Sequence, residues 1–423
     1  MRDPAPTREA IEAVWRVEAA RLLGGLVRFV RDVDRAEDLA QEALLTALER
    51  WPETGIPDNP GAWLMTTARN RAVDERRRRS MMDAKHLEIE RTAAPWATLD
   101  DEAPGDMGDD VLRLVLIACH PVLSKDARVA LTLRLVAGLS TAEIARAFLT
   151  TDSTIAQRIV RAKRTLSEAK VPFDVPTGGE LRARVPPTLE VVYLIFNEGY
   201  TATAGDDWLR PELCEEAMRL GRILAGLVPD EAEVHGLLSL MELQASRARA
   251  RVGPRGEPVL LLEQDRTRWD RLLITRGLAA LDRAQALARP LGPFAIQAAL
   301  AACHARARTP EETDWVRIVA LYDALVEITG SPVVELNRAV AVSMAYGPAE
   351  GLSLVEELAE DAALRDYHLL PAARADLLLK LGRRAEARVQ LEKAARMTMN
   401  TRERDLLLAR AAGCADPERG ASN

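Results

Sequence analysis

The apolar residues of this 423-residue chain recur at three- and four-residue spacing over nearly its whole length. That spacing places them on one face of an α-helix, whereas a half-buried strand needs strict alternation. Alternating runs of Val, Ile and Thr are almost absent, and the helix-favouring residues Ala, Leu, Arg and Glu dominate. The pattern predicts an all-α protein, and the length predicts roughly two to four compact units.

Two segments interrupt the helical pattern. Residues 93–110 combine Pro, Gly and acidic residues without helical periodicity, which predicts a flexible linker, and residues 171–187 predict a second joint. We therefore expect four parts, namely residues 8–80, an acidic linker over 81–110, residues 111–170 and an extension over 171–423.

Charge is distributed unevenly along the chain. Residues 81–110 hold 2 basic and 9 acidic residues, whereas residues 111–170 hold 10 basic and 4 acidic ones. The net charge of −7 therefore does not argue against nucleic-acid binding, because attraction depends on the local field.

Several classes of protein are disfavoured. The chain starts without the pattern of a signal peptide and has no apolar segment long enough to span a bilayer, so we expect a cytoplasmic protein without a membrane partner. The four cysteines lie far apart without a C-x-x-C pair, which favours reduced structural thiols over disulfides or zinc ligands. The five histidines show no metal-ligand spacing, and no phosphate-binding or nucleophile motif occurs. We expect neither an enzyme nor a cofactor or metal.

A first helix is predicted within residues 32–51, DVDRAEDLAQEALLTALERW. Its apolar residues share one side, and its acidic start is free for a partner, although a solvated acidic face is the commoner meaning of such a pattern. The polar residues of this start are Asp34, Glu37, Asp38, Gln41 and Glu42.

A second helix is predicted within residues 59–80, NPGAWLMTTARNRAVDERRRRS, with Asn59 as N-cap and Pro60 at its first position. Four consecutive arginines near its end surround the helix axis, so some of them face solvent and can neutralise phosphates. Trp63 can either pack in the core or stack on an unpaired base.

The two helices together resemble region 2 of the extracytoplasmic-function sigma factors of RNA polymerase, on the phrases D-x-A-E-D-L-x-Q-E and N-P-x-A-W-L-x-x-x-A-R-N-x-x-x-D. The resemblance implies that the first helix binds core RNA polymerase through the five residues named above. It implies that the second helix opens and reads the −10 element of promoter DNA through Trp63, Arg69, Asn70, Asp74, Arg76, Arg77, Arg78 and Arg79.

Residues 135–166 predict a helix-turn-helix. Ser140 and Glu143 have capping-box spacing, and Ile155, Ile159, Ala162 and Leu166 form one buried stripe in the second helix. Gln157 and several arginines lie mostly on the opposite side, as a helix in the major groove requires, although a surface helix with solvated arginines is equally compatible.

This part is similar to region 4 of the same family on the phrase G-L-S-x-x-E-I-A, and departs from it at Leu149 and Ala156. The similarity implies contacts with the −35 element from Ser153, Thr154, Gln157, Arg158, Arg161, Lys163 and Arg164.

The extension contains the phrases FNEGYTATAGDDWLRPELCEEAMRL (196–220) and SPVVELNRAVAV (331–342), and on these it resembles that of a sigma-factor subgroup with a tetratricopeptide-like C-terminal extension. Residues 337–358 and 373–394 match in outline, each with a Gly turn followed by an Ala-Glu pair, at an offset of 35 to 36 residues. Polar and aromatic residues cluster at 197–200 and 265–270, where buried hydrogen bonds between helix ends are the first interpretation and a groove for a protein or small-molecule ligand is the second.

The sequence thus predicts a sigma factor whose extension is a regulatory or interaction module. The alternative is a helix-turn-helix transcriptional regulator with a helical sensor domain, which leaves the pattern in residues 8–80 unexplained.

Overall fold

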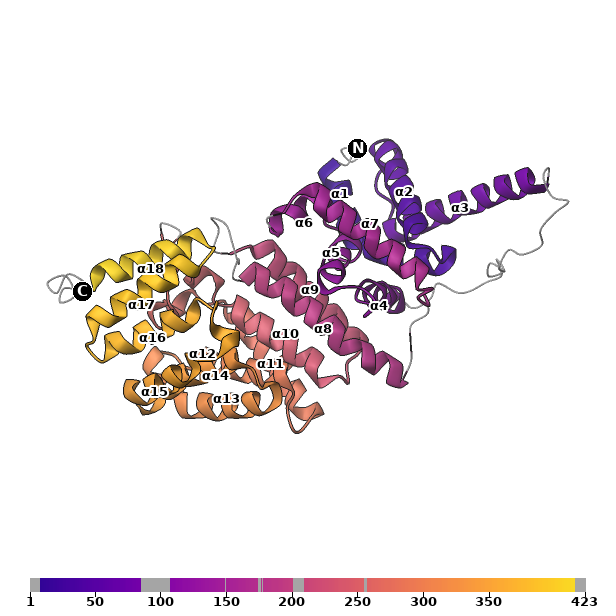
Figure 1. Cartoon of the computed structure of the whole chain (residues 1–423). Coiled ribbons are helices and arrows are strands. Elements are labelled where there is room, and N and C mark those ends of the chain that lie inside the picture. Colours follow the sequence, from indigo (N-terminus) through magenta and orange to yellow (C-terminus); the bar gives the residue numbers. More distant parts are fainter. Residues whose placement is uncertain are drawn as a thin grey trace, which may run out of the picture. The chain divides into compact units, whose positions relative to one another are not determined.

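The computed structural model describes residues 8–84, 107–148, 150–173, 176, 178–200, 209–254 and 257–414. Helices account for nearly all the regular structure in these ranges, and the isolated β-bridge between Val252 and Pro258 joins no strand. The all-α prediction is confirmed. The chain divides into two compact units, residues 1–191 and 192–423 (Figure 1).

The first unit begins with three helices: α1 (Arg8–Val30), α2 (Val33–Thr54) and α3 (Pro60–Ala84), each of which packs against the other two. Leu26, Leu39, Trp51 and Leu64 are at most 1% exposed and form part of their shared core. Gly55 ends α2 at a φ of 84°, which explains why a glycine stands there.

Four shorter helices follow: α4 (Met107–Ala118), α5 (Lys125–Leu135), α6 (Thr141–Ala147) and α7 (Asp152–Glu168). α5 packs against α4, α6 and α7, and its residues Leu131 and Leu133 are fully buried. Gly138, at a φ of 73°, makes the turn between α5 and α6, where a side chain would be strained. The predicted helix-turn-helix is thus present.

The two predicted joints have different outcomes. α3 continues to Ala84 and α4 begins at Met107, and residues 85–106 of the expected acidic linker lie outside the described residues. Within the second expected joint, α8 (Gly178–Tyr200) already begins at Gly178 and includes Pro186 and Pro187. The latter part of that segment is therefore helical, which corrects the expectation of a joint there. Val185, Thr188 and Leu189 are buried, and this burial outweighs the hydrogen bonds that two prolines cost a helix.

The second unit continues as a succession of helices. They are α9 (Pro211–Leu227), α10 (Ala232–Ala245), α11 (Arg271–Leu287), α12 (Pro293–Arg306), α13 (Trp315–Thr329), α14 (Pro332–Tyr346), α15 (Pro348–Leu358), α16 (Leu369–Lys380), α17 (Arg384–Met397) and α18 (Thr401–Gly413). From α9 onward, each helix packs against the one that follows it in the chain. Successive packing of neighbours is the arrangement of a helical-repeat protein.

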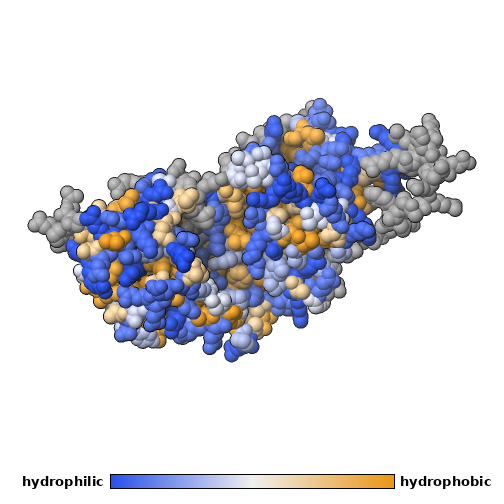
Figure 2. Space-filling view, in the orientation of Figure 1, coloured by the Kyte–Doolittle hydropathy of each residue, from blue (hydrophilic) through white to orange (hydrophobic). Residues whose placement is uncertain are grey.

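The two segments predicted to be repeats form equivalent structures. Each is a pair of helices, α14 with α15 and α16 with α17, and each pair turns at a glycine with positive φ, Gly347 at 120° and Gly382 at 77°. One buried cluster runs through these helices and includes Leu352, Leu378 and Leu391. Figure 2 shows hydrophilic residues over most of the face in view, with hydrophobic residues in separate small areas.

Candidate nucleic-acid interface

The five polar residues predicted to bind polymerase lie on the first three turns of α2. Asp32 caps this helix, because its carboxylate accepts a hydrogen bond of 2.7 Å from the backbone N–H of Arg35. Leu39 and Ala43, fully buried, hold the opposite side of α2 in the core. On the outer side Asp34, Asp38 and Gln41 are exposed, whereas Glu37 and Glu42 are partly buried.

Two of these acids are held by neighbouring basic residues of the three-helix bundle. A guanidinium nitrogen of Arg71 on α3 donates to Glu42 at 2.9 Å. Arg35 pairs with Asp38 at 3.6 Å and also contacts the carboxylate of Glu75 on α3. These pairs orient Glu42 and Asp38 on the surface of α2.

Glu37 and Asp34 are instead held by residues from the helix-turn-helix part. The guanidinium of Arg134 on α5 lies 2.9 Å from Oε1 of Glu37, and Nζ of Lys163 on α7 lies 2.7 Å from both Glu37 Oε2 and Asp34 Oδ1. Burial acts to lower the pKa of Lys163, but its hydrogen bonds and charge interactions with the two carboxylates outweigh it and raise that pKa. Lys163 is therefore a charged residue of an internal ion-pair cluster.

The start of α3 agrees with the sequence prediction. The side chain of Asn59 accepts a hydrogen bond of 3.0 Å from the backbone N–H of Ala62, so Asn59 is the N-cap. Trp63 packs edge to face against the buried Trp51, with ring centroids 5.3 Å apart. Because Trp63 also keeps part of its surface exposed, the structure is compatible with both of the roles expected for it.

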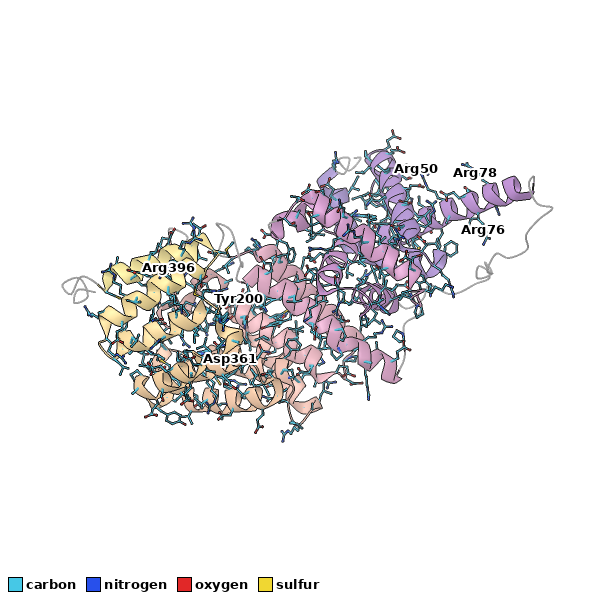
Figure 3. All side chains as sticks on the ribbon, in the orientation of Figure 1. Arg50, Arg76, Arg78, Tyr200, Asp361 and Arg396 are labelled. Atoms are coloured by element: carbon cyan, nitrogen blue, oxygen red, sulfur yellow. The ribbon has the colours of Figure 1, made fainter. Side chains whose placement is uncertain are left out.

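The remaining −10 candidates lie along α3 toward its C-terminal end. The guanidinium of Arg69 lies over the ring of Phe29, 5.6 Å from its centroid. Asn70, Asp74, Arg77 and Arg78 are exposed, and Arg76 is partly buried; the side chain of Arg79 lies outside the described set. Figure 3 shows Arg76 and Arg78 on different sides of α3. The prediction that part of this arginine run faces solvent is confirmed.

The helix-turn-helix begins with the capping box that the sequence predicts. Ser140 Oγ accepts a hydrogen bond of 3.2 Å from the backbone N–H of Glu143, whose carboxylate accepts one of 2.8 Å from the backbone N–H of Ser140. Thr151 caps α7 by accepting from the N–H of Thr154 at 3.2 Å. Of the two departures from the family pattern, Ala156 is partly buried on α7, and Leu149 lies outside the described residues.

One side of α7 is buried as predicted: Ile155, Ile159, Ala162 and Leu166 are at most 5% exposed. Of the seven candidate −35 residues, five are exposed, namely Ser153, Thr154, Gln157, Arg161 and Arg164.

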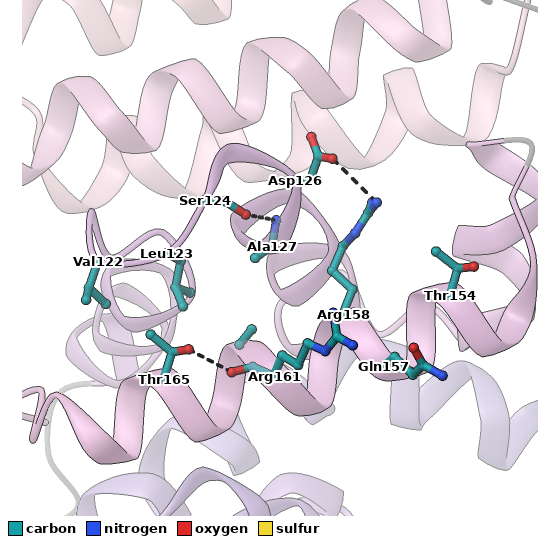
Figure 4. A pocket seen from close by; sticks show the side chains of 11 residues that line it. Val122, Leu123, Ser124, Asp126, Ala127, Thr154, Gln157, Arg158, Arg161 and Thr165 are labelled. Carbon is teal, nitrogen blue, oxygen red and sulfur yellow. Dashed lines mark hydrogen bonds and ion pairs between the residues drawn. The ribbon is translucent and has the colours of Figure 1, made fainter.

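The other two candidates lie at the borders of the exposed side. Arg158 pairs with Asp126 on α5 at 3.4 Å, and Lys163 faces α2. Thr154, Gln157, Arg158 and Arg161 line a cavity of about 440 Å³ between α7 and the start of α5. Figure 4 shows Arg158 reaching across this cavity to Asp126. The structure thus brings six of the seven together along α7 and turns Lys163 elsewhere.

The polar and aromatic clusters of the extension form buried contacts. Tyr200 stacks on Phe196 with centroids 5.5 Å apart, and the guanidinium of Arg251 lies 3.7 Å from the Tyr200 centroid. Glu198 forms an ion pair with Arg210.

In the second cluster, Arg266 is 7% exposed and donates to the backbone carbonyls of His304 and Ala307 at 2.7 Å each. Asp265 caps a 3₁₀ turn, and Asp270 caps α11. These contacts support the structural interpretation of both clusters, because they join helix ends and loops.

An open groove of about 800 Å³ also lies beside this second cluster. Three of its lining residues are the exposed Arg249, Arg268 and Arg271, next to the buried ring of Trp269. Asp270 also lines the groove, but the arginines outnumber this carboxylate, and we call it the basic groove of the extension.

The described residues contain no group of three or more His, Cys, Asp or Glu side chains that could hold a metal ion. Burial raises the pKa of Cys119 to about 11 and of Cys214 to about 12, so both thiols stay protonated near neutral pH. Burial, followed by the charges of Arg247 and Arg266, lowers the pKa of His304 to about 4. Within the same part of the chain, no helix is both long and apolar enough to cross a membrane.

Sequence reasoning missed three residues that determine the charge of these surfaces. Arg71 pairs with Glu42, Asp126 with Arg158, and Arg134 with Glu37. Arg134 and Glu37 are 97 residues apart in the chain. No local motif marks such a pair, because a charged residue in an amphipathic helix is ordinarily solvated.

Three family models match this chain. Residues 16–81 match Sigma-70 region 2, residues 113–166 match Sigma-70 region 4, and residues 184–285 match a family of unknown function, DUF6596. The first two matches contain α2, most of α3, α5, α6 and most of α7. The third contains the clusters around Tyr200 and Trp269 and the basic groove.

Some similar proteins match most of the chain, and others match only its first part. Uncharacterized protein R00370 of Rhizobium meliloti (strain 1021) is 44% identical over 384 residues, which is 90% of each chain. The RNA polymerase sigma-H factor of Pseudomonas aeruginosa is 32% identical over 158 residues, 36% of this chain and 82% of that one. The RNA polymerase sigma factor CarQ of Myxococcus xanthus is 35% identical over 140 residues, 32% of this chain and 75% of that one.

Among solved structures, the crystal structure of yeast Tom70 aligns with a TM-score of 0.31 and 11% identity, over 96% of this chain and 84% of that one, a likeness too low to inform the fold. The relatives and the region 2 and region 4 matches establish the family, and the packing of α9 to α18 establishes the architecture of the extension. The chain belongs to the extracytoplasmic-function family of RNA polymerase sigma factors, in a form that carries a C-terminal helical-repeat extension.

Proposed function

We propose that this sigma factor binds core RNA polymerase through the outer side of α2 and directs promoter-specific initiation. In this proposal α3 opens and reads the −10 element, and α7 reads the −35 element. The observation that carries it is the placement, in the first unit, of an exposed acidic surface on α2 and two separate exposed basic surfaces on α3 and α7.

The chemistry of each surface suits its proposed partner. Arg77 and Arg78 are exposed and can neutralise phosphates near a melted segment, and the partly exposed Trp63 offers an aromatic face. Gln157 and Arg161 lie on the exposed side of α7, where side chains of their length reach base edges in a major groove. Asp38 and Gln41 remain exposed on α2 for polymerase.

Transcription from genomic DNA tests this proposal, because every promoter of the genome is then present in one reaction. Purified core polymerase is incubated with the DNA, with or without the protein, and the 5′ ends of the transcripts are mapped. We expect new start sites that share two sequence elements at constant spacing. Absence of new start sites, together with a palindromic footprint of the protein alone, would favour the helix-turn-helix regulator and refute the proposal.

We further propose that the extension regulates initiation, as a fused module that binds a protein or small-molecule ligand. The basic groove lined by Arg249, Arg268 and Arg271 supports this role, because it is an exposed concave surface inside the part of the chain that matches no sigma-factor region. An anionic group is the ligand chemistry that such a surface favours.

Two truncations test the role of the extension. A chain that ends at Lys170 loses all of α8, whereas one that ends at Tyr200 keeps Thr188, which is 1% exposed, and the Lys125–Glu190 ion pair of the first unit. The longer form therefore removes α9 to α18 and the basic groove while sparing contacts within the first unit. We expect its initiation rate to differ from that of the full chain. An equal rate in vitro and in cells would refute a regulatory role.

A further inference from the structure

The docking of the helix-turn-helix part on α2 uses the same carboxylates that the proposed function assigns to polymerase. Glu37 receives Arg134 at 2.9 Å and Lys163 at 2.7 Å, and Asp34 receives the same lysine at 2.7 Å. These are ion pairs with short distances, and each oxygen of Glu37 has a cation within 2.9 Å. Neither cation belongs to the three-helix bundle itself.

Burial distinguishes this cluster from an ordinary surface ion pair. The side chains of Lys163 and Glu37 are 12% and 14% exposed, respectively, whereas Asp34 is 70% exposed. A charged side chain with so little exposed surface is stable only beside an opposite charge, because breaking the pair inside the interface leaves a buried unpaired charge. Glu37 is consequently unavailable to any other protein while Arg134 and Lys163 remain in place.

A second contact joins the three-helix bundle to the helix-turn-helix part. This contact does not involve α2 or its charges. α4 packs against α1 at Gly24 and Gly25, and a Cβ atom at Gly24 would overlap the backbone carbonyl oxygen of Asp110. A Cβ at Gly25 would meet Cε of Met65 on α3 at 2.5 Å and the Asp110 carboxylate at 3.2 Å, and that carboxylate lies 3.9 Å from Arg28 on α1. The approach of α4 therefore explains the glycine at position 24, where a glycine in mid-helix costs stability, whereas Met65 of the bundle makes the closest contact at position 25.

The docked arrangement leaves part of α2 accessible. Asp38 and Gln41 are exposed, and one turn further along Leu45 is 58% exposed, so that the three form a stripe beside Glu37. A partner that requires only this stripe can approach the docked form. A partner that also requires Glu37 cannot complete its contact until Arg134 and Lys163 withdraw.

We propose that Arg134 and Lys163 form an intramolecular docking surface for α2, and that this docked form competes with the binding of core polymerase. The occupant of the surface is thus the acidic start of α2 in the same chain, with Glu37 as its central residue. The inference rests on the proposed function, because it takes α2 as the polymerase-binding helix. In the free protein, Arg134 and Lys163 then cover Glu37, one of the residues proposed to bind polymerase. We call this arrangement the closed form.

The closed form has a measurable effect on affinity. Where only a fraction of the molecules is competent to bind, the apparent dissociation constant rises in inverse proportion to that fraction. A closed form populated to about 90% therefore weakens polymerase binding about tenfold, and a variant that cannot close recovers the difference.

Two kinds of variant open the docked form without altering the proposed polymerase surface. The double variant Arg134→Gln and Lys163→Gln removes both cations. Gly24→Ala leaves all the charges in place but disturbs the contact with Asp110, and alanine keeps α1 helical. The matched control is Lys125→Gln with Lys170→Gln, two exposed lysines at the start of α5 and after the end of α7; Lys125 pairs at 3.8 Å with the exposed Glu190 rather than with α2.

Affinity for core polymerase is measured by fluorescence anisotropy on the full-length chain, after thermal unfolding has shown that each form is folded. We expect both opening variants to bind core about tenfold more tightly than the wild type and the control pair to bind as the wild type does. If the wild type binds core but the opening variants bind it no more tightly than the wild type does, the proposed competition is overturned and the proposed function is not affected. If every form fails to bind core, the proposed function falls and the competition falls with it.

An energy-transfer measurement follows the docking directly in the wild-type background. Dyes are placed at Val17→Cys on α1 and Val160→Cys on α7, both 64% exposed, with Cys414→Ser removing the cysteine that is not buried. We expect addition of core to reduce the transfer efficiency, and Gly24→Ala to reduce it without core. Transfer that stays unchanged when core binds would show that the docked form persists in the complex and would overturn the proposal.

Discussion

The indole rings of Trp51 and Trp63 meet edge to face, with centroids 5.3 Å apart and an angle of 62° between their planes. Trp51 is 1% exposed and comes from the end of α2, whereas Trp63 lies in the first turn of α3. The contact therefore joins the proposed polymerase-binding helix to the helix proposed to read the −10 element. A partly exposed aromatic residue held in this way has a defined orientation toward a partner.

Replacement of Trp51 by alanine removes the ring on which Trp63 rests. We expect Trp51→Ala to destabilise the three-helix bundle by about 3–5 kcal/mol, the usual cost of deleting a large buried aromatic side chain. Hydrogen exchange of the α1 to α3 amides during urea titration measures this loss without requiring the two units to unfold together. Trp51→Phe is the matched control and should lose less. A loss below about 1 kcal/mol for the alanine variant would contradict the packing role.

In the proposed function, the exposed arginines near the end of α3 contact promoter phosphates, and such contacts make binding depend on salt. Each phosphate contact contributes about 0.9 to the slope of log K against log salt concentration. We expect Arg77→Gln with Arg78→Gln to reduce that slope, for the complex of core, sigma factor and promoter, by about 1 to 2. Arg50→Gln, at an exposed position of α2 (Figure 3), should leave it unchanged. An unaltered slope in the double variant would remove these arginines from the DNA interface.

Arg161 lies on the exposed side of α7 beside the cavity shown in Figure 4. In the proposed function Arg161 makes a bidentate contact to a base of the −35 element, so we expect Arg161→Ala to cost about 1–3 kcal/mol in binding to promoters with the preferred element. Transcription is compared on templates that differ at single −35 positions. The variant should discriminate less at one position, whereas Lys125→Gln should retain the wild-type preference. A uniform loss on all templates would indicate a phosphate contact instead.

His304 makes the stability of the extension depend on pH. Burial first, and then the charges of Arg247 and Arg266, lower its pKa from 6.5 to about 4 in the folded protein. The unfolded chain therefore binds a proton at higher pH than the folded chain, so stability is lost as the pH falls from 6.5 toward about 4. Between pH 7 and pH 5 we expect a loss of up to about 2 kcal/mol from this residue.

Chemical denaturation of wild type and His304→Gln at pH 7 and pH 5 measures this dependence. The glutamine variant should lose less stability between the two pH values, even if it is less stable at pH 7. The same pH dependence in both proteins would show that His304 is not the group responsible.

The sequence by itself determined the helical class and the local features that follow from short-range chemistry. Asn59 and Ser140 can be recognised as caps from their neighbours and are caps in the structure, because a cap depends on residues two or three positions away. The buried stripe of α7 from Ile155 to Leu166 likewise follows from helical periodicity alone. The exposed arginines of α3 could be predicted because no packing can enclose consecutive charges.

The tertiary structure decided which charges remain available to a partner. Glu37 and Lys163 both have the sequence signature of surface residues, one expected to bind polymerase and the other DNA, yet they bind each other across 126 positions of the chain. Residues 171–187 predict a joint, but α8 begins at Gly178 and continues through Pro186 and Pro187, where burial outweighs their local cost. In both cases the outcome depends on packing between segments distant in sequence, and spacing within one segment carries no information about that packing.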